Sequence, residues 1–152
     1  MNLQDKAMKL LVESESNVLV VGRTGAGKTT LIRNSRIPNS KYFDFVELLK
    51  SEWPSHGILT EEVFHSFEPF FLGLKEEVLI LDAVEFPKDI SNSQLIGFIK
   101  TIRKKNKRLI VVAYPENVTQ VLELFGVVIS MEMSSGQEYI TYSIENAEEK
   151  GK

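Results

Sequence analysis

Cysteine is absent from the 152-residue sequence, and histidine occurs only twice. Without thiols the chain can form neither a disulfide framework nor a thiolate metal site nor a cysteine nucleophile. His56 and His65 are too few and too scattered along the chain to indicate a zinc site. The lack of cysteine is typical of an intracellular protein.

Long apolar runs are also missing. No segment approaches the roughly 20 apolar residues that a membrane helix needs, and charged residues interrupt the apolar ones near the N-terminus, unlike in a signal peptide. We therefore expect a cytoplasmic protein. The formal net charge of -3 argues against a protein that coats nucleic acid through bulk positive charge, so any such contact must be local.

The hydrophobic content of 43% is enough for one sizeable core and leaves little for a second. We expect a single domain over residues 1–152, with an N-terminal helix and lead-in at 1–16 and a charged, frayed tail at 145–152. No internal repeat or low-complexity segment divides the chain.

Aliphatic or β-branched segments alternate with segments of helical periodicity. This alternation predicts an α/β fold of three layers, in which a mostly parallel sheet of about five strands lies between helices, because parallel neighbours need crossover connections. Strands are expected at 18–21, 42–46, 78–81, 109–113, 127–129 and 139–144, and helices at 3–12, 28–35, 60–71, 92–102 and 116–125. Residues 47–50 could instead begin a helix.

The strongest motif is the segment from Gly22 to Thr29, which matches the pattern GxxxxGK[ST] in full. It follows an aliphatic strand directly and opens a helix, as a phosphate-binding loop should. Its glycines permit backbone angles that other residues avoid, so that main-chain N–H groups can surround an anion at the positive end of the helix. The candidate phosphate-binding residues are Gly22, Arg23, Thr24, Gly25, Ala26, Gly27, Lys28, Thr29 and Thr30.

With a second segment, Val78 to Asp82, the chain resembles the P-loop NTPases. The first segment corresponds to their Walker A motif and the second to their Walker B motif. The resemblance implies that the protein binds ATP or another nucleoside triphosphate with Mg²⁺. It also implies that Lys28 reaches the β- and γ-phosphates, that the Thr29 hydroxyl ligates the metal, and that Asp82 binds it directly or through water. The alternative for Asp82 is a cap of the next turn.

Within this family the chain is most similar to the RecA-type and AAA-type ATPases, in which an extra strand separates the two motif strands. The strand at 42–46 falls between the two motifs along the chain. Guanine-specific GTPases are less similar, because no Asn-Lys-x-Asp motif is present. The segment 134–138, Ser-Ser-Gly-Gln-Glu, is similar to the ABC-transporter signature, but it follows the Walker B segment and we interpret it as a turn.

Hydrolysis requires a carboxylate that orients or deprotonates the attacking water. Many relatives carry a glutamate directly after the Walker B aspartate, where this chain has Ala83. The candidates are Glu47, placed at the end of the second expected strand as in RecA-like proteins, and Glu85. Either could instead be a solvated charge. Tyr114, after the fourth expected strand, could sense the γ-phosphate or simply pack.

Three functions remain open from the sequence. The first is a minimal ATPase that couples Mg-ATP binding and slow hydrolysis to a macromolecular partner or a second copy of the chain. The others are a nucleotide-binding regulatory module without hydrolysis and a small-molecule or nucleoside kinase. A basic run could contact nucleic acid or could be a solvated helix end; its residues are Lys100, Arg103, Lys104, Lys105, Lys107 and Arg108. A phenylalanine cluster could form core or dock a partner; its residues are Phe64, Phe67, Phe70 and Phe71.

Overall fold

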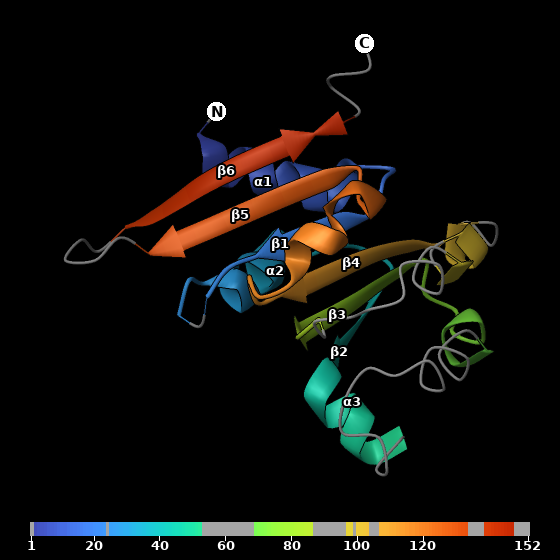
Figure 1. The fold of residues 1–152 in the computed structure, drawn as a ribbon. Helices are drawn as coiled ribbons and strands as arrows, with labels where there is room; N and C mark the ends of the chain where they lie inside the picture. Colours follow the sequence, from blue (N-terminus) through green and yellow to red (C-terminus); the bar gives the residue numbers. More distant parts are fainter. Residues whose placement is uncertain are drawn as a thin grey trace.

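The sheet at the centre of the molecule has six strands in the part of the chain that the computed structural model describes (Figure 1). The described residues are 2–23, 25–52, 69–86, 97–98, 100–103, 107–133 and 139–147. The strands are β1 (Val18–Val21), β2 (Ser40–Asp44), β3 (Val78–Val84), β4 (Arg108–Ala113), β5 (Val127–Met133) and β6 (Ile140–Asn146). The helices are α1 (Leu3–Glu13), α2 (Lys28–Ser35) and α3 (Phe45–Glu52), with two short 3₁₀ helices at Val118–Gln120 and Leu122–Leu124.

The strand order is β2-β3-β4-β1-β5-β6. The first five strands run parallel, and β6 pairs antiparallel with β5. The predicted α/β class with a mostly parallel sheet is confirmed; the sheet has six strands rather than about five, because all six expected strand segments join it. Because parallel strands end at the same edge, the carboxyl ends of β1, β2, β3 and β4 lie together there, where ligands bind in such sheets.

Helices cover both faces of this sheet, and alternate residues of β1 show why. Val18 and Val20 pack in a cluster with Ala7 and Leu11 of α1 and with Leu31 of α2. Leu19 and Val21 face the opposite way and pack with residues of α3 and with Phe71, Phe98 and Ile102. Since successive side chains of a strand point to opposite faces, a wholly apolar strand such as β1 needs cover on both sides.

The second strand and the helix after it differ from the prediction. The strand covers Ser40–Asp44 rather than 42–46, and Phe45 already belongs to α3. Asp44 ends the strand because its Oδ1 accepts a hydrogen bond from the backbone N–H of Glu47 at 3.1 Å, which is the geometry of a helix N-cap. The side chain of Phe45 is then buried in the core, which anchors the first turn of α3.

The helix expected at 116–125 is wrong, since only the two short 3₁₀ helices form there. Asn117 has a left-handed φ of 64°, and its side-chain amide donates to the Phe86 carbonyl at 2.9 Å. That conformation does not fit a regular helical turn. The last strand is also longer than predicted, because β6 continues to Asn146, past residue 145 where the tail was expected to begin.

Several predicted features lie outside the described residues. They include His56, His65, the turn at 134–138, residues 148–152, and most of the helices expected at 60–71 and 92–102. The described parts of those two segments, 69–72 and 97–103 without residue 99, are helical. Among the described residues, no helix combines the length and apolarity that crossing a bilayer requires.

Candidate functional site

The glycine-rich loop connects the carboxyl end of β1 to the first turn of α2. Gly25 and Gly27 have φ values of 87° and 86°, a region that favours glycine, so these two positions meet the prediction that the loop needs glycine for its backbone. Gly27 is the N-cap of α2, and no side chain caps the helix. The first hydrogen bond within the helix runs from Leu31 N to Gly27 O at 2.9 Å. The backbone N–H groups of residues 28–30 therefore have no acceptor within the helix.

Gly22 needs to be glycine for a different reason from the one predicted. Its φ is not in the left-handed region; instead, a Cβ atom at this position would lie 2.7 Å from the Met131 carbonyl oxygen. The end of β5 therefore packs against the start of the loop too closely for a side chain. The loop is fixed by a backbone contact here and by backbone conformation at Gly25 and Gly27.

The substitutions Gly22→Ala and Gly25→Ala should separate these two causes. At Gly25 nothing lies within 4 Å of a built Cβ, so alanine adds only left-handed strain, about 1–2 kcal/mol of unfolding free energy. At Gly22 the alanine must displace the β5 backbone, and we expect a larger loss in urea unfolding. Equal losses for the two variants would contradict the proposed contact.

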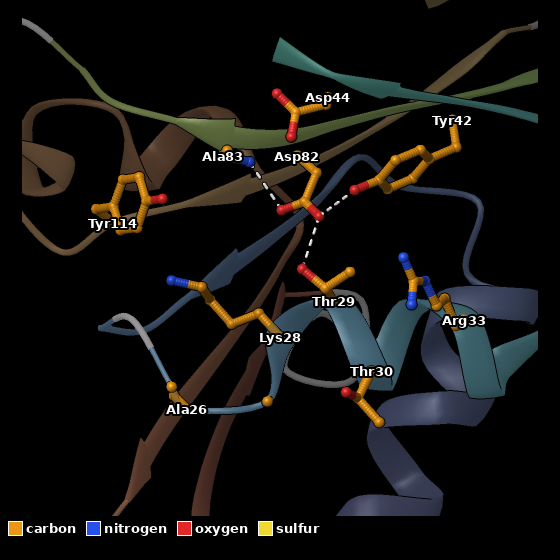
Figure 2. A pocket seen from close by; sticks show the side chains of 12 residues that line it. Ala26, Lys28, Thr29, Thr30, Arg33, Tyr42, Asp44, Asp82, Ala83 and Tyr114 are labelled. Atoms are coloured by element: carbon orange, nitrogen blue, oxygen red, sulfur yellow. Dashed lines mark hydrogen bonds between the residues drawn. The ribbon is translucent and has the colours of Figure 1, made fainter. Parts of the chain in front are cut away.

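A pocket of about 460 Å³ opens at the carboxyl edge of the sheet over this loop (Figure 2). Its lining comes from the loop, α2 and the ends of β2, β3 and β4, and consists of Gly25, Ala26, Gly27, Lys28, Thr29, Thr30, Arg33, Tyr42, Asp44, Asp82, Ala83 and Tyr114. Gly22 and Arg23 line a neighbouring cavity of about 710 Å³ beside β5 and β6, and Thr24 lies outside the described residues. The structure thus brings six of the nine predicted phosphate-binding residues into one pocket.

Lys28 is buried, with 8% of its surface exposed, although lysine is rarely buried without a partner. Its ammonium group donates a hydrogen bond to the Gly22 carbonyl and lies 4.5 Å from the centre of the Tyr114 ring. Burial lowers the pKa of Lys28, and the nearby carboxylates of Asp82 and Glu116 oppose that shift. A desolvated ammonium of this kind would gain a great deal from a polyanion.

Asp82 lies inside β3 rather than after it, because the strand continues through an irregularity. The register between β3 and β4 shifts between Leu81 and Val84, and Ala83 has a left-handed φ of 64°. A bulge of this kind turns a side chain toward a new direction, and such bulges occur often beside functional sites. Here it accompanies a buried carboxylate at the pocket floor, with 4% of Asp82 exposed.

Both carboxylate oxygens of Asp82 accept hydrogen bonds. Oδ1 accepts from the backbone N–H of Ala83 at 2.7 Å. Oδ2 accepts from the Thr29 hydroxyl at 2.8 Å and from the Tyr42 hydroxyl at 2.5 Å, as the dashed lines in Figure 2 indicate. Burial, and secondly the hydrogen bond to Asp82, raise the pKa of Tyr42. The two residues predicted to hold a metal, Thr29 and Asp82, are therefore in direct contact.

The donor set at this position fits Mg²⁺. A hydroxyl and a carboxylate are hard oxygen ligands, and Mg²⁺ in proteins takes one or two such groups together with phosphate oxygens and water. Within the described part of the chain, no cluster of three or more His, Cys, Asp or Glu side chains could hold a metal without such help. Thr29 and Asp82 could thus hold a metal in company with a phosphate ligand.

The carboxylate that accompanies Asp82 in the pocket is Asp44, which was not among the predicted site residues. Asp44 pairs with Asp82 in the register of the parallel strands β2 and β3, so both side chains lie at the carboxyl edge of the sheet and line the pocket there. Glu47 lies in the first turn of α3, is exposed, and forms an ion pair with Lys50 at 3.9 Å. Glu85 is also exposed. Neither glutamate is among the residues that line the pocket.

A signal for Asp44 was present in the sequence. Residues 44–47 read Asp-Phe-Val-Glu, which is the pattern of an N-cap followed three residues later by glutamate. This pattern ends the strand at Asp44 and moves Glu47 into the helix. Arg33, which also lines the pocket, lies four residues after Thr29 and so shares its helix face. Nothing in the sequence indicates the contact of Tyr42 with Asp82, since it depends on the strand register.

The described end of the basic run, Arg103, Lys107 and Arg108, lies at the opposite edge of the sheet, where β4 begins. Three of its residues donate to backbone carbonyls: Arg103 to Glu15 at 3.0 Å, Lys107 to Leu74 and Glu76 at 2.6 and 2.5 Å, and Arg108 to Leu11 at 2.5 Å. Arg108 is also buried. Lys104 and Lys105 lie outside the described residues. At least half of the run therefore has a structural role, and its contact with nucleic acid stays a prediction.

The strand between the two motif strands is not the predicted segment at 42–46. The segment at Ser40–Asp44 forms the outer edge of the sheet, and β4 lies between β1 and β3. Sequence order could not reveal this, because β4 follows both motifs along the chain. The motif strands are separated, as expected, but by a different strand.

No protein-family model matches the chain, and neither does any curated protein. Among solved structures, one that is similar is B204, the DNA-packaging ATPase from Sulfolobus Turreted Icosahedral Virus, with a TM-score of 0.53 and 14% sequence identity. The match covers 80% of this chain and 78% of that chain. At this identity the likeness shows the fold alone: a mixed α/β fold with a mostly parallel sheet, similar to an ATPase fold.

Proposed function

We propose that the protein binds a nucleoside triphosphate, with ATP as the expected ligand, together with Mg²⁺ and hydrolyses it slowly. The observation that carries this proposal is the hydrogen bond of 2.8 Å between Thr29 and Asp82. It brings the hydroxyl of the glycine-rich loop and the buried strand carboxylate together at the helix N-terminus that no side chain caps. Magnesium bound there would neutralise charge on the β- and γ-phosphates.

The residues of the loop have separate tasks in this proposal. The amides at the start of α2 bind phosphate oxygens, since the helix leaves them free and its dipole favours an anion. Lys28 carries three N–H donors and uses one on the Gly22 carbonyl, so two remain for the phosphates. The Tyr114 ring beside its ammonium group holds the lysine chain against the pocket wall.

Asp44 is our candidate for the carboxylate that orients the attacking water, in place of Glu47 and Glu85. It lines the pocket beside Asp82 and is exposed, so that water reaches it. One of its oxygens, Oδ1, caps α3, which holds the side chain in place and leaves Oδ2 available for water. Such a base contributes about 10²–10⁴-fold to the rate in enzymes that use one.

One feature supports our proposed likeness to the RecA-type and AAA-type branch. The strand β4 separates the two motif strands, as the extra strand of that branch does. Separately, the solved structure B204 is described as a DNA-packaging ATPase, which is compatible with an ATPase that acts on a macromolecular partner. We propose such a partner, a protein, a nucleic acid or a second copy of this chain, for the present protein as well.

A regulatory module that binds nucleotide without turnover is the second candidate. It is favoured by Ala83, which occupies the place after Asp82 with a left-handed backbone and no carboxylate. The kinase alternative has less support, because another strand separates the two motif strands, as in the ATPase branch.

Phosphate release from ATP, with and without Mg²⁺, tests the proposal in wild type and in Asp82→Asn. We expect slow, Mg²⁺-dependent release by wild type and loss of the Mg²⁺ dependence in the variant, because the amide cannot replace the anionic ligand. ATP binding without release would favour the regulatory module. Metal-dependent release that is unchanged in Asp82→Asn would overturn the site assignment.

A further inference from the structure

The hydrogen bonds that Asp82 accepts restrict which of its oxygens can contact a metal. Each carboxylate oxygen offers about two acceptor positions. On Oδ2 both are taken, one by the Thr29 hydroxyl and one by the Tyr42 hydroxyl. On Oδ1 only one is taken, by the backbone N–H of Ala83. The remaining acceptor position of Asp82 is therefore on Oδ1.

Tyr42 is well placed to maintain this arrangement. It lies on β2, pairs in register with Ile80 of β3, and reaches from there to Asp82, two residues further along β3. Figure 2 shows its hydroxyl directed at Asp82 from the side opposite Lys28. The ring is only partly covered, with 40% of the residue exposed, so packing alone does not account for its orientation. The hydrogen bond to Asp82 does.

We propose that Tyr42 is a positioning residue that selects the way in which Asp82 contacts the metal. Oδ2 is the carboxylate oxygen in contact with Thr29, so it is the one that a metal held by Thr29 would reach directly. By filling Oδ2 together with Thr29, the Tyr42 hydroxyl would leave Asp82 to contact that metal from Oδ1, through a metal-bound water. Thr29 is then the direct protein ligand. This inference rests on the proposed function, because it assumes a metal bound with nucleotide at Thr29 and Asp82.

The substitution Tyr42→Phe isolates the hydroxyl, since phenylalanine keeps the ring and its place on β2. It frees one acceptor position on Oδ2, and Asp82 can then ligate the metal directly. Tyr142→Phe is the matched control, because it removes the hydroxyl of a half-buried tyrosine on β6, in the cluster with α1 and α2. The probe is Mn²⁺ with a non-hydrolysable ATP analogue, and the readout is the number of metal-bound waters from pulsed electron paramagnetic resonance in ¹⁷O-enriched water.

We expect Tyr42→Phe to hold one water fewer on Mn²⁺ than wild type and Tyr142→Phe, and to bind Mn²⁺ several-fold more tightly. Equal water counts in wild type and Tyr42→Phe would overturn the role of Tyr42 while leaving the proposed function intact. If wild type bound no Mn²⁺ with the nucleotide analogue, the proposed function itself would fail, and this inference with it.

Discussion

Lys28→Met lowers the affinity for ATP by at least about 100-fold, because hydrogen bonds from a charged donor contribute about 1.5–3 kcal/mol each and Lys28 has two donors free for phosphate. The same substitution should leave the unliganded protein as stable as wild type, or make it more stable. Burial already lowers the pKa of Lys28, which means that the folded protein disfavours the charged ammonium. Methionine has a similar length and carries no charge to desolvate.

Calorimetric titration with Mg-ATP and urea unfolding measure the two effects in the same samples. Lys41→Met is the matched control, since Lys41 is an exposed lysine on β2 that does not line the pocket. It should change neither property appreciably. If the Lys28→Met variant bound Mg-ATP as tightly as wild type does, the conclusion that the phosphates bind in this pocket would be wrong.

Asp44→Asn lowers the rate of ATP hydrolysis by about 100-fold or more, the range of a general base, with little change in ATP affinity. Asparagine caps helices about as well as aspartate, so the bond from Glu47 N persists and α3 keeps its start. Only the negative charge at the pocket is lost. Single-turnover phosphate release measures the rate, and calorimetry measures the affinity.

Asp44→Ala separates the cap from the chemistry. This variant loses both the carboxylate and the helix cap, and removal of a cap costs about 0.5–2 kcal/mol of unfolding free energy. We expect both variants to hydrolyse slowly and only Asp44→Ala to be less stable. Full activity in Asp44→Asn would contradict the role of Asp44, and loss of activity in Glu47→Gln instead would return that role to Glu47.

Local patterns were sufficient to predict the elements around the glycine-rich loop. The strand at Val18–Val21 and the helix at Lys28–Ser35 have the bounds that were expected, because aliphatic residues, glycine and a helix start follow one another there without ambiguity. Prediction was poorer where local signals compete. The cap at Asp44 ended the second strand two residues earlier than expected, and the left-handed Asn117 replaced a helix with two 3₁₀ turns.

The walls of the pocket depend on contacts between segments far apart in the chain, which single-sequence patterns do not encode. Asp44 and Tyr42 reach the site because β2 pairs with β3 in a particular register. The insertion of β4 between β1 and β3 places Tyr114 beside Lys28. The contacts of Arg103, Lys107 and Arg108 could not be predicted either, because their partners are backbone carbonyls of segments distant in the chain.

The most direct test is a structure of the protein with Mg²⁺ and a non-hydrolysable ATP analogue. We predict that the β- and γ-phosphates lie against the amides that begin α2, within hydrogen-bonding reach of Lys28, with the γ-phosphate on the side of Asp44 and Asp82. A triphosphate bound elsewhere on the protein, or a glycine-rich loop that stays empty at saturating analogue, would contradict the account.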